Sequence, residues 1–175
     1  MATAIFTKIG QAEAKVHGTS LRQVHFHEVG AIDSIADIVG TAIAWDALGI
    51  THAASSAVPT GNGFIEIAHG RCAIPAPATA ELLTGIPLAP STVEAELTTP
   101  TGAAIVATLC EAFGPAPAMT IRKIGYGAGT RRLGTTSKLT ANHAGRNIRC
   151  PECRGGNDLG LGNQSRSSDR RADRL

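Results

Sequence analysis

Apolar residues recur at helical spacing at the start of the chain. In residues 3–16 they fall on one face of a helix, with lysine and glutamate between them, and Gly18 ends the pattern. A second helix is predicted over residues 33–48, with Asp33 as its N-cap and Gly49 as its stop. The first fifty residues are therefore predicted to form two helices.

The pattern changes to a β type in residues 57–74. Glycines mark a turn before the segment from Phe64 to Ile67, whose composition is typical of a strand. His69 and Gly70 form a predicted turn to a second short strand. This part of the chain is therefore predicted to form two short strands joined by a turn.

Proline marks the starts of two further helices, because its fixed backbone suits a first helical turn. One spans residues 75–83, and the other, residues 103–113, follows the sequence TTPTG, in which threonine caps and proline starts a helix. Residues 121–126 are predicted as a strand. Since strands and helices alternate, the predicted fold class is α/β or α+β, a small mixed sheet with packed helices.

The composition changes after Leu133. Gly, Ser, Asn and Arg dominate from Gly145 to the end, with few large apolar residues. Such a segment cannot bury enough surface to offset its chain entropy. We therefore predict one folded domain, residues 1–133, and a disordered tail, residues 134–175.

Composition and charge exclude several classes of protein. A net charge of +2 gives no case for nucleic-acid binding, and the tail from Arg146 holds seven arginines against four acidic residues, which leaves the remainder near neutral. There is no run of roughly 18 apolar residues that would span a membrane. Four cysteines in a chain of 175 residues do not form a disulfide framework. We expect a cytoplasmic protein that binds neither nucleic acid nor membrane.

The sequence VHFHEVGAIDSIADIVG, residues 24–40, gathers residue types that bind metal ions. If its start is extended, His25 and His27 project to one side, while Asp33 and Asp37 share a face of the helix that follows. Imidazole together with carboxylate suits Ni, Zn, Co or Fe better than Mg or Ca. The alternative is a capping aspartate and two histidines on an exposed strand. Spacing alone leaves both interpretations open.

Two other stretches bear candidate binding groups. In TTPTG, the start of a helix at Thr99, Thr101 and Gly102 would present backbone N–H groups to an anion such as phosphate, with ordinary capping as the alternative. GYGAGTRR adds flexible backbone and Arg131, without the following helix that a nucleotide-binding glycine motif needs. His69 would join the metal candidates only if the fold brought it near the other histidines.

Four stretches of the chain, in consistent order, resemble the LarC family. They are VHFHEVGAIDSIADIVG, VPTGNGFIEIAHGRCAIPAPATAELLTGIP, ELTTPTGAAIVATL and IRKIGYGAGTRRL. The resemblance covers roughly residues 2–133, and several long motifs in register are far more specific than one. LarC proteins are the nickel insertion proteins, or cyclometallases, of nickel-pincer cofactor biosynthesis.

The resemblance implies a function. It implies nickel insertion into a pyridinium bisthiocarboxylic acid mononucleotide, forming carbon–nickel and sulfur–nickel bonds, with CTP consumed and Mg or Mn required. The product is the cofactor of lactate racemase and related enzymes. The site residues that we assign on this basis are His25, His27, Glu28 and His69 for the metal, Asp33 and Asp37 for catalysis, and Thr99, Thr101, Gly102 and Arg131 for the mononucleotide.

The resemblance also implies that the chain is a central part of the family protein. LarC proteins begin with a glycine-rich segment resembling GGASGDM and continue into a C-terminal domain associated with CTP, and neither is matched here. A separate C-terminal LarC domain would then be a partner, and we expect a homo-oligomer. The alternatives are a non-catalytic nickel chaperone or oligomerisation module, and an inactive truncated product.

Overall fold

The computed structural model describes four stretches of the chain: residues 1–24, 32–67, 70–128 and 139–147. The two helices predicted first are confirmed as α1 (Ala2–His17) and α2 (Ile32–Ala47). Both end as predicted, because Gly18 and Gly49 adopt the left-handed conformation, each with φ 62°. After α1, the N–H of Thr19 donates to the carbonyl of Ala14 at 2.9 Å, the bond of a Schellman cap.

The start of α2 differs from the prediction by one residue. The helix begins at Ile32, so Asp33 lies in its first turn and is not the N-cap. From that position its carboxylate Oδ1 accepts the N–H of the next residue, Ser34, at 2.9 Å. The prediction of Asp33 as a cap was therefore wrong, although its carboxylate still binds an amide at the start of the helix.

The strands form four two-stranded sheets, two parallel and two antiparallel, within the described part of the chain. The mixed α/β class is thus confirmed, with separate strand pairs in place of one small sheet. The antiparallel pair at Phe64 confirms the two predicted short strands. The pairs are β1 (Ala53–Ser55) with β6 (Cys110–Phe113), parallel; β2 (Val58–Pro59) with β5 (Leu88–Ala89), parallel; β3 (Phe64–Ile67) with β4 (Gly70–Ala73), antiparallel; and β7 (Met119–Ala128) with β8 (Leu139–Asn147), antiparallel.

The two helices predicted beside prolines are confirmed, although the first begins two residues later than predicted and the second three residues earlier. These are α3 (Pro77–Leu82) and α4 (Pro100–Leu109), each with proline in its first turn. The prediction that the second continues to Phe113 was wrong, because the last four residues form β6. They pair in parallel with β1, and the N–H of Gly114 then donates to the carbonyl of Ser55 at 2.8 Å. Pairing with a distant strand overrides the local helical pattern there.

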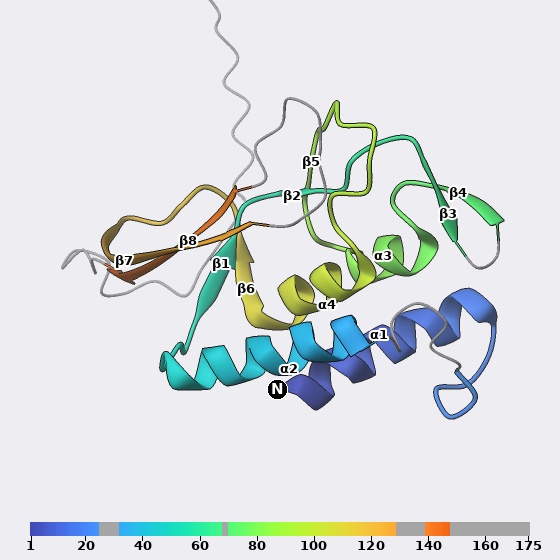
Figure 1. Cartoon of the computed structure of the whole chain (residues 1–175), viewed down its shortest axis with the longest axis horizontal. Helices are drawn as coiled ribbons and strands as arrows, with labels where there is room; N and C mark the ends of the chain where they lie inside the picture. Colours follow the sequence, from blue (N-terminus) through green and yellow to red (C-terminus); the bar gives the residue numbers. More distant parts are fainter. Residues whose placement is uncertain (25–31, 68–69, 129–138, 148–175) are drawn as a thin grey trace, which may run out of the picture.

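The core lies where α1, α3 and α4 meet, with α2 against α1 and α4 (Figure 1). It is built from aliphatic residues and alanine, as the low aromatic content requires. Ile5, Ile9 and Ile38 are fully buried, and two alanines of α4 allow close helix packing. The buried cluster is Ile5, Ile9, Ala12, Ile38, Val58, Leu82, Leu83, Ala103 and Ala104.

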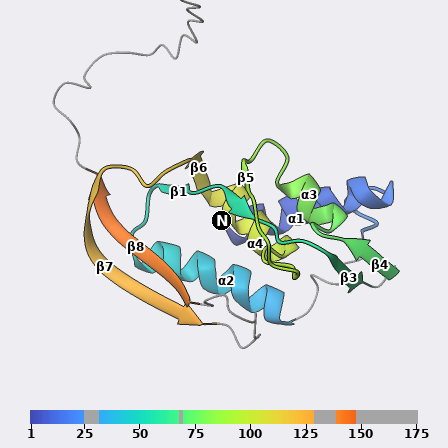
Figure 2. The same cartoon turned by 90° about the horizontal axis from the view of Figure 1, so that it is seen from above.

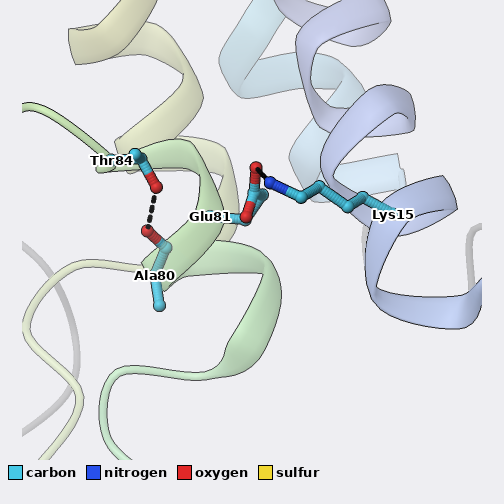
Figure 3. A network of polar contacts seen from close by, with 4 residues as sticks. All are labelled: Lys15, Ala80, Glu81 and Thr84. Atoms are coloured by element: carbon cyan, nitrogen blue, oxygen red, sulfur yellow. Dashed lines mark hydrogen bonds and ion pairs between the residues drawn. The ribbon is translucent and has the colours of Figure 1, made fainter.

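Two lysines of α1 tie it to its neighbours. Lys8 Nζ donates to the backbone carbonyl of Ala107 in the last turn of α4 at 2.7 Å. Lys15 pairs with Glu81 of α3 (Figure 3). The second pair is exposed, and ion pairs of that kind contribute little to stability. The contact of Lys8 matters more, because its ammonium group donates to the Ala107 carbonyl. That carbonyl lies in the last turn of α4, where the helix itself supplies no N–H partner.

The predicted strand at residues 121–126 is confirmed within β7, and its partner was not foreseen. β8 falls inside residues 134–175, which composition predicted as a disordered tail, so the structure differs from the prediction for residues 139–147. The ladder joins backbone groups, which Gly, Asn and Ala supply as well as larger residues do. Residues 148–175 lie outside the described part, and a domain boundary near Leu133 remains a prediction.

Candidate functional site

Helices α2 and α4 lead into strands that pair in parallel. Each strand follows one of these helices in the chain, and the two strands run in the same direction. The two helices also run in the same direction, as Figures 1 and 2 show. Their N-terminal turns lie at the same end of the molecule, away from the strand pair.

A buried hydrogen bond joins the two N-terminal turns. Thr101 of α4 donates from Oγ1 to Oγ of Ser34 of α2 at 3.3 Å, and each residue is only 8% exposed. This bond connects two stretches that the sequence analysis treated separately, the metal-binding candidate around Asp33 and the anion-binding candidate TTPTG. Ser34 was missed as a site residue, although it lies within the first of these motifs.

The start of α4 is capped as its sequence predicts. Oγ1 of Thr99 accepts the N–H of Gly102 at 3.3 Å, and the N–H of Ala103 donates to the Thr99 carbonyl at 2.9 Å. Pro100 has no N–H to donate. The alternative of ordinary capping is therefore confirmed. Among the described residues of this turn, the amide N–H of Thr101 is the one that could still donate to an anion.

Replacing Thr99 by alanine is expected to lower the free energy of unfolding by about 0.5–2 kcal/mol, because the N–H of Gly102 loses its acceptor. Urea denaturation followed by circular dichroism would measure the change. Thr99→Ser keeps the hydroxyl and should remain close to wild type. A serine variant as unstable as the alanine variant would show that the methyl group, and not the cap, is what matters.

The loop VPTGNG packs against the segment that leads into α4. Thr98 Oγ1 donates to the carbonyl of Pro59 at 2.7 Å, and the N–H of Leu97 donates to the carbonyl of Thr60 at 3.0 Å. Gly61 follows with φ 87° and lies directly against the backbone of Ala95. The stretches VPTGNG and ELTTPTG are thus joined by a side-chain and a backbone hydrogen bond beside the N-terminus of α4.

The two candidate catalytic carboxylates lie on the first two turns of α2. Asp33 and Asp37 are four residues apart, which places them on one helical face, and both are exposed. Asp33 is adjacent in the chain to Ser34, whose hydroxyl accepts from Thr101. The structure therefore brings Asp33 and the start of α4 to the same end of the molecule.

The remaining predicted site residues lie outside the described part of the chain. These are His25, His27, Glu28, His69 and Arg131. Within the described ranges, no three His, Cys, Asp or Glu side chains gather as a metal site. Burial raises the pKa of the Cys110 thiol above its ordinary value, which disfavours the thiolate that metals and electrophiles require.

Comparison with known proteins decides the family. A family model described as nickel insertion protein matches residues 1–152. The chain belongs to this nickel insertion family. The resemblance to LarC noted from the sequence is thereby confirmed, and the match extends through β8.

Individual relatives of the family are closely similar over the same region. A protein of Desulfitobacterium hafniense, named pyridinium-3,5-bisthiocarboxylic acid mononucleotide nickel insertion protein, is 54% identical over 129 residues, which are 74% of this chain and 32% of that protein. A Staphylococcus epidermidis protein of the same name is 61% identical over 127 residues, 73% of this chain and 32% of its own. A relative from Rhodopirellula baltica, also named for nickel insertion, is 68% identical over 133 residues, 76% of this chain and 34% of its own.

The chain spans about a third of the length of the curated relatives that it matches. No solved structure matches it. Among the described residues, no helix combines the length and apolar character that crossing a membrane requires.

Proposed function

We propose that this chain is the nickel-holding part of an enzyme that inserts nickel into pyridinium-3,5-bisthiocarboxylic acid mononucleotide. The family match over residues 1–152 carries the proposal, supported by two relatives whose names specify this substrate. In this proposal Ni(II) is a substrate that the protein receives, holds and transfers, so its site must bind and also release the ion.

The proposed ligands are His25, His27 and Glu28, with His69 as a further candidate. Imidazole nitrogen and carboxylate oxygen are ligands of intermediate softness, which suit Ni(II). The first three directly precede α2 in the chain, and α2 begins at Ile32. The proposed metal ligands are therefore followed at once by the helix that carries Asp33 and Asp37.

The start of α4 is the proposed position of the mononucleotide phosphate. Thr99, Thr101 and Gly102 form its first turn, and Arg131 would add a guanidinium that can bind phosphate with two hydrogen bonds. The Ser34–Thr101 bond supports this arrangement, because it holds the first turn of α4 against the first turn of α2. A metal held before α2 and a phosphate held at α4 would thus share one end of the molecule.

Forming a carbon–nickel bond requires a base. The C–H bond of the pyridinium ring breaks, its electron pair goes to Ni(II), and the proton must be accepted nearby. We assign this role to the carboxylates of Asp33 and Asp37, which lie on the helix after the proposed metal ligands. The alternative within the same proposal is that these carboxylates complete the coordination of the ion.

The wider activity depends on more than this chain. In the proposal, CTP with Mg or Mn is used by the whole family protein, a lyase that matures the cofactor of lactate racemase in the cytoplasm. The remaining two thirds of the relatives' length would supply the CTP chemistry, as another part of the same protein or as a separate C-terminal domain.

Isothermal titration calorimetry with Ni(II) tests the metal site. Wild type is expected to bind Ni(II), and His25→Ala combined with His27→Ala is expected to abolish binding because two imidazole ligands are lost. The matched control is His52→Ala, since His52 already pairs at 2.9 Å with Glu111 of β6, the strand that follows the C-terminal end of α4. The control should bind Ni(II) as wild type does.

The same titration separates the two roles of the carboxylates. Asp33→Asn with Asp37→Asn should leave Ni(II) affinity unchanged if the carboxylates act as bases, and should weaken it if they are ligands. Wild-type protein that fails to bind Ni(II), or binding that survives loss of both histidines, would overturn the proposed metal site. Binding without cofactor formation, after addition of the rest of a relative's chain, would instead favour a nickel chaperone.

A further inference from the structure

The contact between α2 and α4 at their N-terminal ends is made by two buried hydroxyl groups. Thr101 Oγ1 donates to Ser34 Oγ at 3.3 Å, and both residues are buried. When both partners of a buried hydrogen bond are replaced by apolar groups of the same shape, the stability of a fold changes little. Stability therefore gives little reason for a pair of hydroxyls at this position, and a role in binding is the other reason.

Ser34 is bonded both to the start of its own helix and to the start of α4. Its backbone N–H donates to Asp33 Oδ1 at 2.9 Å, and its hydroxyl accepts from Thr101. Ile38, one turn later on the same face of α2, is fully buried in the core. Packing of this face therefore fixes Ser34, and the first turn of α4 is attached to a fixed point.

Thr101 uses its hydroxyl in this contact and keeps its backbone amide free. In the same turn, Thr99 Oγ1 accepts the N–H of Gly102, and Pro100 has no N–H. Among the hydrogen bonds of the described residues, none uses the N–H of Thr101. Thr101 can therefore meet an anion with its amide, while its side chain is engaged with α2.

We propose that the hydroxyls of Ser34 and Thr101 are positioning groups, which hold the first turn of α4 so that the Thr101 amide is ready for the mononucleotide phosphate. The end of a helix frays readily, because its outermost groups have no partner within the helix. Anchoring the Thr101 side chain to a buried residue reduces the ordering that binding must otherwise bring about. These roles rest on the proposed binding of the mononucleotide at α4, and in them the Thr101 side chain positions the turn and does not contact the phosphate.

Calorimetric titration of the full chain with pyridinium-3,5-bisthiocarboxylic acid mononucleotide, without metal, tests these roles. Thr101→Val keeps the shape of the side chain and loses the hydroxyl, so it is expected to raise the dissociation constant about 3–10-fold. Ser34→Ala should weaken binding to a similar extent, because it removes the same bond. The conservative variant Thr101→Ser keeps the hydroxyl and should recover most of the affinity.

The double variant, Ser34→Ala with Thr101→Val, separates positioning from stability. Each single substitution leaves one buried hydroxyl without its partner and should lower the urea midpoint, whereas the double substitution removes both hydroxyls and should restore much of it. Affinity for the mononucleotide should stay as low as in the single variants, because the bond is still missing. The matched control is Thr79→Val, the same substitution at a fully buried threonine of α3, which should bind as wild type does.

Three results would overturn the positioning roles while wild type still binds the mononucleotide. The first is wild-type affinity in Thr101→Val or Ser34→Ala. The second is affinity that recovers together with the urea midpoint in the double variant, since binding would then follow stability. The third is a loss in Thr101→Ser as large as in Thr101→Val, which would assign the effect to the methyl group. Wild type that does not bind the mononucleotide would instead overturn the proposed function, and the positioning roles with it.

Discussion

Gly61→Ala is expected to destabilise the protein by about 2–5 kcal/mol, combining left-handed backbone strain with a steric clash. The residue has φ 87°, and a Cβ atom would lie 1.8 Å from the carbonyl oxygen of Ala95. The obstruction is backbone, so no side-chain rotation relieves it. Hydrogen bonds on both sides of Gly61 hold the two segments together. The N–H of Leu97 donates to the carbonyl of Thr60, and the N–H of Asn62 donates to the carbonyl of Val93 at 2.9 Å.

Gly63→Ala is the matched control for this prediction. Gly63 also has a positive φ, 92°, but the nearest atoms to its Cβ would be those of Glu94 at 4.0 Å. Its substitution carries the strain without the clash, about 1–2 kcal/mol. Urea denaturation of both variants gives the two free energies, and equal losses would show that close approach to Ala95 is unimportant.

Ile38→Ala is expected to lower the free energy of unfolding by about 2–5 kcal/mol. Ile38 is 0% exposed, and with Ser34 it is one of two buried residues of α2. Losing most of its side chain would leave a cavity and weaken the packing of α2 against α1 and α4. Thermal and urea unfolding would measure the loss.

Hydrogen exchange would show where Ile38→Ala acts. Amides of α2 should exchange faster relative to those of α1, because the helix is otherwise held by few buried side chains. Leu48→Ala, in the turn directly after the same helix and 67% exposed, should change stability by no more than about 0.5 kcal/mol. A loss of stability in Ile38→Ala no larger than that in Leu48→Ala would show that burying Ile38 contributes little to the stability of the fold.

Local signals in the sequence predicted most of the helical fold. Gly18 and Gly49 end helices because a left-handed residue is needed there, and Thr99 with Pro100 starts one because of the chemistry of capping. The predictions were wrong for strands whose partner strand is distant in the sequence. Residues 110–113 continue an apolar helical pattern, yet they form a strand because β1 lies beside them.

The sequence predicted the motifs of the candidate site separately, but it did not predict which of them lie next to one another in the fold. TTPTG and the first turn of α2 each stood out by residue type, whereas the bond between Thr101 and Ser34 joins residues that are 67 positions apart. Thr98 and Pro59 are likewise 39 positions apart. No spacing rule connects such residues, because their proximity results from tertiary packing, of α2 against α4 for the first pair and of β2 against the segment before α4 for the second.

That parallel packing has an electrostatic consequence. Helices that lie side by side and point the same way bring like partial charges together at both ends, and this raises the energy of the pair. Lys8 offsets the effect at the C-terminal end, where it binds the carbonyl of Ala107, and Asp33 places one negative charge at the other end. A further negative group at that end would relieve the repulsion, and the phosphate of a mononucleotide is such a group.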